Sequence, residues 1–243
     1  MTHSFFNVSP SYSFDVVSAV VRLAHKYNVE DVQAQALDAL KMWCTDDFKT
    51  WCSTSEDPID AEFKRAIGVV NIARLTDTPS MLPVAFYHCC ALGGGLRDGW
   101  TRRDGTIETC TQEDVWRCLE GRDRLAKESI AHLYRVFRPI VSDTCRTLNA
   151  CTSSLGRILA RVMVNEDAGS STLLDSWAIP INKYTNDCPL CADCKQELLD
   201  RDIHERQKLW NKLPGIFDLS IDGWGAEKNE EASAQAEEVR RRT

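Results

Sequence analysis

The chain has 243 residues, of which 43% are hydrophobic and 27% charged, and its formal net charge is −7. A chain of this length and composition can bury a full hydrophobic core. The acidic balance argues against a nucleic-acid interface, which needs concentrated lysine and arginine. No apolar stretch approaches the roughly 18 residues of a membrane span, and the N-terminus lacks the features of a secretory signal. These properties predict a cytoplasmic or nuclear protein that binds neither nucleic acid nor membrane.

The N-terminal half predicts a series of capped helices. Apolar side chains repeat at helical spacing over residues 12–27, and Asn28 stops this first helix. The same spacing continues over residues 29–43, so the two helices are expected to form an antiparallel pair. Asp57-Pro58 and Thr78-Pro79 each place a capping residue before a proline, which predicts two further helix starts.

The C-terminal half begins with an irregular glycine-rich segment at residues 93–105, and any strands should be short and confined to residues 95–112. The run from Thr111 to Asp114 resembles a capping box that opens a helix, and Pro139 ends that helix. Two more helices are expected beyond this point, and Pro214 should end the last of them.

Strand-like alternation of convincing length is missing from the sequence, so the predicted fold class is all-α. The expected organisation is a flexible N-terminus at residues 1–11, one helical domain at 12–218 and a disordered tail at 219–243. The tail ends in Glu, Ala, Gln and Arg without an aromatic residue, a composition that cannot build a core.

Catalytic motifs are missing as well. The run of Gly93, Gly94 and Gly95 lacks the Gly-Lys-Ser/Thr ending of a phosphate-binding loop. The pair His204-Glu205 resembles the start of a zinc-protease motif, but Lys208 stands where the second histidine should be. There is no G-x-S-x-G nucleophile elbow. We therefore expect no enzymatic activity.

Three cysteines near the C-terminus, Cys188, Cys191 and Cys194, repeat at three-residue spacing. Two overlapping C-x-x-C steps can present thiolates to one zinc ion, and they still leave it one ligand short. Proline at position 189 favours a helical turn after Cys188, so the three thiols should lie within reach of one another.

The candidate fourth ligands are Cys151, Cys145 and His204. Packing as a buried apolar cluster and a redox pair stay open as alternative interpretations of the triplet. The other cysteines of this eleven-cysteine chain are expected to be reduced thiols that pack as small apolar residues, namely Cys44, Cys52, Cys89, Cys90, Cys110 and Cys118.

Four segments together resemble the fungal BTB/POZ-domain proteins: Ser13 to Tyr27, Ala73 to Pro83, Cys118 to Leu125 and the Cys188-Pro-Leu-Cys191 region. The likeness runs from about residue 12 to residue 218. In that family these segments follow the BTB fold and continue through a helical region similar to a BACK domain. The resemblance implies dimerisation and cullin recruitment, through a BTB core that would lie upstream of residue 12. The chain is then either a shortened paralogue or a gene model that begins late.

The resemblance implies a non-enzymatic protein-protein interaction module, such as an adaptor. Without the upstream core, the first helix pair should leave an apolar face exposed, and we expect Val17 and Val21 on that face to mediate self-association. The alternative is a zinc-stabilised structural domain organised by the cysteine triplet, with no cofactor other than zinc. A thiol oxidoreductase is a more distant alternative.

Overall fold

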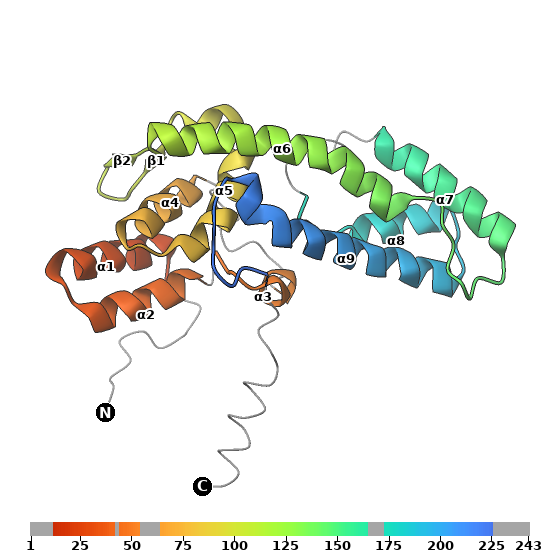
Figure 1. Ribbon diagram of the computed structural model, residues 1–243, viewed down its shortest axis with the longest axis horizontal. Coiled ribbons are helices and arrows are strands. Elements are labelled where there is room, and N and C mark those ends of the chain that lie inside the picture. The colour runs from red at the N-terminus through yellow and green to blue at the C-terminus, as the bar shows by residue number, and fades with distance from the viewer. Residues whose placement is uncertain (1–11, 42–43, 54–63, 165–172, 226–243) are drawn as a thin grey trace, which may run out of the picture.

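The computed structural model describes residues 12–41, 44–53, 64–164 and 173–225. Within these residues the chain folds into helices and one antiparallel two-stranded hairpin (Figure 1). The α-helices are α1 (Phe14–Tyr27), α2 (Glu30–Lys41), α3 (Phe48–Ser53), α4 (Arg65–Leu75), α5 (Leu82–Ala91), α6 (Gln112–Phe137), α7 (Leu148–Met163), α8 (Ala178–Asp187) and α9 (Ala192–Ile216). The 3-10 helices are η1 (Pro79–Met81) and η2 (Gly93–Leu96), and the strands are β1 (Trp100–Thr101) and β2 (Ile107–Glu108).

The predicted all-α class is confirmed, and the described strands lie inside residues 95–112 as expected. No helix in the described part of the chain is long and apolar enough to cross a membrane. The expected helix start at Asp57-Pro58 and the N-terminal segment 1–11 lie outside the described residues.

Helices α1 and α2 pack against each other as predicted. Asn28 ends α1 in a left-handed conformation, with φ 54°, and its backbone N–H donates to the carbonyl oxygen of His25 at 3.2 Å. The predicted N-cap of α6 also forms, since the Thr111 hydroxyl accepts a hydrogen bond from the backbone N–H of Asp114 at 3.1 Å and donates one to the Asp114 carboxylate at 3.0 Å. Local capping chemistry therefore sets these helix boundaries.

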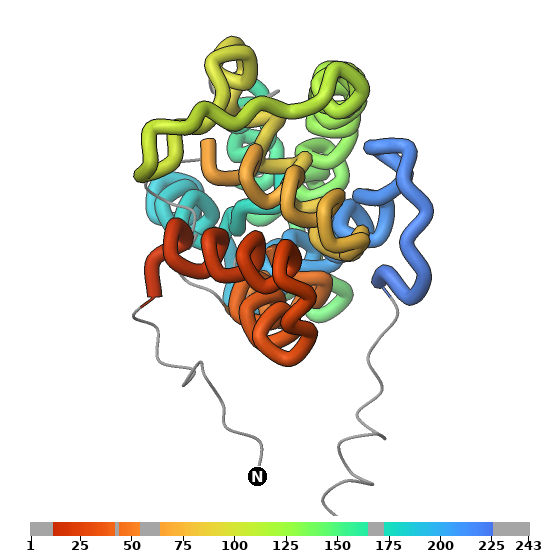
Figure 2. The backbone as a smooth tube through the Cα atoms, turned by 90° about the vertical axis from the view of Figure 1, so that its left-hand side faces the viewer, coloured from red at the N-terminus to blue at the C-terminus, as the bar shows by residue number. Residues whose placement is uncertain are grey.

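The predicted exposed face of the first helix pair is wrong where it names Val17 and Val21. Both side chains are fully buried in the first hydrophobic core. Helix α4 packs against α1 (Figure 2), and the Trp100 ring of β1 lies 5.2 Å from the ring of Phe14. Segments that come later in the chain thus supply the cover that was expected from an upstream domain.

The long helices α6 and α9 run antiparallel along the molecule and join two separate cores (Figure 1). Leu125 of α6 and Trp210 of α9 belong to the first core, together with α1, α4 and α5. Leu133 of α6 and Leu198 of α9 belong to the second core, together with α7 and α8. Helices α6 and α9 therefore contribute buried side chains to both cores.

A buried polar layer separates the two cores along this helix pair. It contains Ser129 and His132 of α6 and Asp202, Glu205 and Arg206 of α9. The Arg206 guanidinium donates to the Asp202 carboxylate at 3.1 Å, and Nε of Arg135 donates to Glu205 at 2.6 Å. The Arg135–Glu205 pair joins α6 to α9 and favours this alignment of the two helices, whereas the Asp202–Arg206 pair lies within α9.

Helix α9 does not end at Pro214, as the sequence predicts, but continues to Ile216. Proline has no N–H to donate, so the carbonyl of Trp210, one turn earlier, lacks its usual helical partner. The indole N–H of Trp224 donates to that carbonyl at 2.7 Å, and the Trp224 ring stacks on Trp210 at 5.0 Å. The prediction that the chain becomes disordered from residue 219 is therefore wrong for residues up to Trp224, which packs on the folded chain.

Gly121 of α6 faces the end of α9, where an added Cβ would lie 2.3 Å from the buried ring of Phe217. We expect Gly121→Ala to destabilise the fold by about 1–3 kcal/mol, since the overlap outweighs the gain of roughly 1 kcal/mol in helix propensity. Gly156 of α7 has open space around the same atom, so Gly156→Ala should instead stabilise by about 0.5–1 kcal/mol. Urea denaturation of both variants measures the difference, and equal effects would contradict the close approach.

His132 gives the polar layer a pH dependence of predictable sign. Burial, followed by the charge of Arg135, lowers the pKa of His132 to about 4. Between about pH 6.5 and pH 4 the unfolded chain therefore binds a proton that the folded chain does not, and stability falls as the pH falls. The total loss is roughly 3 kcal/mol, of which about 2 kcal/mol falls between pH 7 and pH 5.

We expect His132→Leu to remove this loss, and the exposed control His204→Gln to keep it, in urea titrations near pH 7 and pH 5. Burial raises the pKa of Asp202 in the same layer, so its protonation opposes the loss in wild type and in His132→Leu alike. The pH range from 7 to 5 lies above the titration of the carboxylates Glu128 and Glu205. Burial alone would raise their pKa values, but ion pairs that include Arg135 lower them, so their effect begins only at more acidic pH. A His132→Leu variant with the wild-type pH dependence would contradict the prediction.

Candidate metal centre

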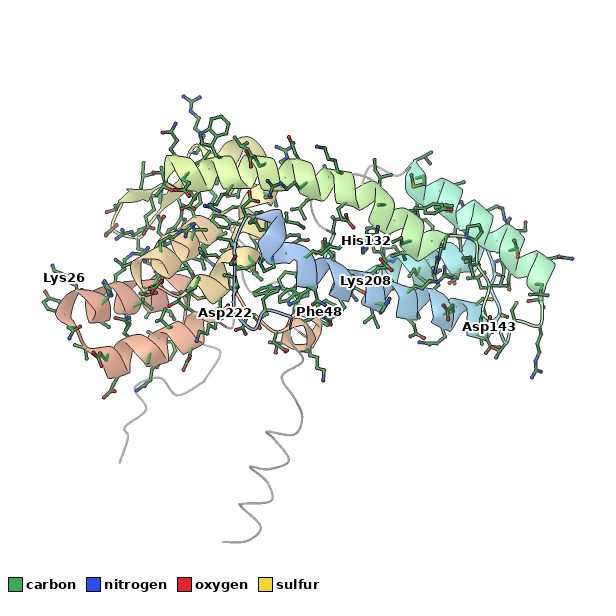
Figure 3. All side chains as sticks on the ribbon, viewed as in Figure 1. Lys26, Phe48, His132, Asp143, Lys208 and Asp222 are labelled. Carbon is green, nitrogen blue, oxygen red and sulfur yellow. The ribbon has the colours of Figure 1, made fainter. Side chains whose placement is uncertain are left out.

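The candidate site lies at the end of the molecule where the α6–α7 loop meets the junction of α8 and α9. Asp143 of this loop is labelled in Figure 3. The buried Arg201 guanidinium of α9 donates to the carbonyl oxygen of Arg138 at 3.0 Å and to that of Ile140 at 2.8 Å. These two hydrogen bonds hold the start of the loop against α9. Cys145 of the loop therefore lies near the beginning of that helix.

Four cysteine sulfurs converge there. Cys145 comes from the loop, Cys151 from the first turn of α7, Cys191 from the N-cap of α9 and Cys194 from its first turn. All four sulfurs lie within 4.8 Å of one another, and those of Cys145 and Cys191 are 3.8 Å apart. A tetrahedral zinc ion with Zn–S bonds of about 2.3 Å places its sulfurs about 3.8 Å apart. The four thiols can therefore hold a single metal ion.

Backbone N–H groups already point at these sulfurs. The N–H of Ser142 lies 3.4 Å from the sulfur of Cys194, and that of Cys191 lies 3.4 Å from the sulfur of Cys151. The N–H of Cys194 lies 3.5 Å from the sulfur of Cys191, which caps α9. Such donors stabilise thiolates and orient them, as the outer shell of a metal site does.

The thiols of the α9 pair differ in acidity. The backbone N–H of Cys194 is the main cause that lowers the pKa of Cys191 to about 7, and hydrogen bonds from neighbouring thiols assist. Burial raises the pKa of Cys194 to about 12. Without a cation, one thiol of the pair is partly ionised near neutral pH and the other keeps its proton. Metal binding must therefore release protons.

The structure brings together three of the predicted ligands, Cys151, Cys191 and Cys194, and adds Cys145, which the sequence offered as an alternative fourth ligand. Cys188 does not join them, because it ends α8 and packs in the second hydrophobic core. The chain forms no helical turn between Cys188 and Cys191, since α9 begins only at Ala192. The other candidate ligand, His204, is exposed on α9.

The remaining thiols do not form a second centre within the described residues, where these four cysteines are the group close enough to share an ion. Hydrogen bonds with Cys110 and Cys118, together with burial, raise the pKa of Cys89 well above its usual value. That thiol keeps its proton and is a poor ligand. The predicted packing of the six other cysteines as buried apolar residues holds for five of them, and Cys52 is exposed.

Comparison with known proteins gives no relative: no family model, no curated protein and no solved structure matches this chain. The resemblance to BTB/POZ-domain proteins therefore stays a prediction.

Proposed function

We propose that the protein is a non-enzymatic, zinc-stabilised helical domain of a reducing compartment, the cytoplasm or nucleus. The observation that carries this proposal is the convergence of Cys145, Cys151, Cys191 and Cys194 within 4.8 Å. Four thiolates complete the coordination of zinc and leave no open position for water or substrate, as in structural rather than catalytic sites. Thiolate ligation also requires reduced cysteines, which those compartments maintain.

The ion would act as a cross-link between segments that are distant in sequence. Cys145 and Cys151 precede and begin α7, whereas Cys191 and Cys194 begin α9. Zinc would therefore close the second core around α7 and α8, and its binding energy would add directly to the folding free energy. The second core needs such support more than the first, because it contains fewer buried side chains.

Charge supports this assignment. Zinc with four thiolates carries a net charge of about −2, which needs compensation when half of its ligands are buried. The buried guanidinium of Arg201 interacts electrostatically with Cys194, and its hydrogen bonds to the carbonyls of the α6–α7 loop fix its position. It lies in position to offset part of the negative charge.

Metal analysis of the purified chain tests the proposal. We expect about one zinc ion per chain in wild type and in Cys188→Ala, and none in Cys194→Ser, as plasma mass spectrometry would report. A chelator should destabilise wild type in urea denaturation by several kcal/mol and leave Cys194→Ser unchanged. A wild-type chain without stoichiometric metal would refute the site, and bound iron would replace zinc as the assigned ion.

The exposed Cys52 provides the matched control, because Cys52→Ser removes a thiol without touching the cluster. This variant should bind zinc like wild type. If Cys188→Ala loses zinc while Cys145→Ser retains it, the ligand set proposed here is wrong.

A second candidate function is protein-protein interaction through the outer face of α1. We define this face by Val16, Val20, Leu23 and Tyr27, which repeat at helical spacing beside the buried Val17 and Val21. Val20 is partly buried against the first core. Leu23 is 54% exposed and Tyr27 is 67% exposed. Asp15 in the first turn of α1 is already paired with Arg103 at 3.4 Å, so self-association through this face would depend on its apolar side chains.

We therefore expect weak self-association through α1, with Leu23→Asp shifting the chain to a monomer in sedimentation experiments. Leu119→Asp is the matched control, because Leu119 is a similarly exposed leucine on α6. It should behave like wild type. A wild-type monomer at all accessible concentrations would eliminate self-association through this face.

A further inference from the structure

The four cysteines of the candidate metal centre are not equally accessible. Cys151 and Cys194 are buried, with 1% and 0% of their surface exposed. Cys145 and Cys191 are each partly exposed, and their sulfurs are 3.8 Å apart. They are the two partly exposed residues among the four ligands, so a small solute would meet this pair before the buried one.

We propose that Cys145 and Cys191 form an oxidation-sensitive pair, which a peroxide converts to a disulfide with release of the zinc ion. The inference rests on the proposed zinc site and adds a chemical means of opening it. The oxidant belongs to the class of hydrogen peroxide and small organic hydroperoxides.

The reaction balances as a two-electron oxidation. One thiolate attacks a peroxide oxygen, the O–O bond breaks, and a sulfenic acid and hydroxide form. The second thiolate then attacks the sulfenic sulfur, the S–S bond forms, and a second hydroxide leaves. Two protons from solvent convert the two hydroxides to water. Zinc stays in its divalent state throughout, and two sulfurs lose the negative charge that bound it.

The new bond requires only a short approach of the two sulfurs. A disulfide needs its sulfurs about 2.05 Å apart, so the two must approach by less than 2 Å from their present 3.8 Å. Cys145 lies in the irregular loop between α6 and α7, and Cys191 is the N-cap that precedes the first helical residue of α9. Neither residue lies inside a helix, in contrast to Cys151 and Cys194.

Loss of these two ligands leaves only Cys151 and Cys194, which is too few for a structural zinc site. The disulfide would still join the loop to the start of α9, whereas Cys151 and therefore α7 would lose their link to the metal. Oxidation should thus loosen α7 against the second core without unfolding the first core.

The test uses the full zinc-loaded chain and hydrogen peroxide added in steps. Released zinc is followed with a chromophoric chelator, and disulfides are mapped by mass spectrometry after tryptic digestion without reduction. Cys145 is the single cysteine of the tryptic peptide 136–146, and Cys151 is the single cysteine of 147–157. The peptide 184–195 contains Cys188, Cys191 and Cys194. Fragmentation of the cross-linked peptides assigns the partner of Cys145.

We expect one zinc ion released for each disulfide between Cys145 and Cys191, and full rebinding after reduction in the presence of zinc. The variant Cys52→Ser should respond like wild type, because Cys52 is an exposed thiol outside the centre. Zinc retained under peroxide, or released with a Cys191–Cys194 disulfide instead, would overturn this inference alone. A chain that binds no zinc before oxidation would overturn the proposed function instead.

Discussion

The contact between α6 and α9 is the constraint on which the rest of the structure depends, because both hydrophobic cores are built against this one pair of helices. Three kinds of contact fix the position of α6 relative to α9. Gly121 allows the Phe217 ring to approach α6, the Arg135–Glu205 ion pair links the two helices, and Arg117 and Arg124 of α6 bind carbonyls at the end of α9. A slip by one turn would break all three sets of contacts at once.

The two cores reach stability by different means. The first contains large, fully buried aromatic side chains such as Phe86, Trp210 and Phe217, whose buried apolar surface stabilises it. The second is smaller, and a metal cross-link at its far end would supply what its apolar area lacks. The buried polar layer lies between the core stabilised by apolar burial and the core that the metal would stabilise.

Local chemistry made part of this structure predictable. The stop at Asn28 and the cap at Thr111 follow from side chains that satisfy nearby backbone groups, so the sequence identifies them directly. The candidate site was only partly predictable, because the set of converging thiols depends on where α9 begins and on the path of the α6–α7 loop. The buried state of Val17 could not be read locally either, since α4 and Trp100 supply its cover.

The role of Trp224 has a practical consequence for how the folded unit is delimited. Its indole occupies the hydrogen-bonding position that Pro214 leaves empty, and its ring covers Trp210. A recombinant fragment cut after residue 218 would retain all helices of the described part of the chain and still expose an unsatisfied carbonyl beside a large aromatic surface. Such a fragment should be prone to aggregation, so the C-terminal boundary for expression belongs after residue 225.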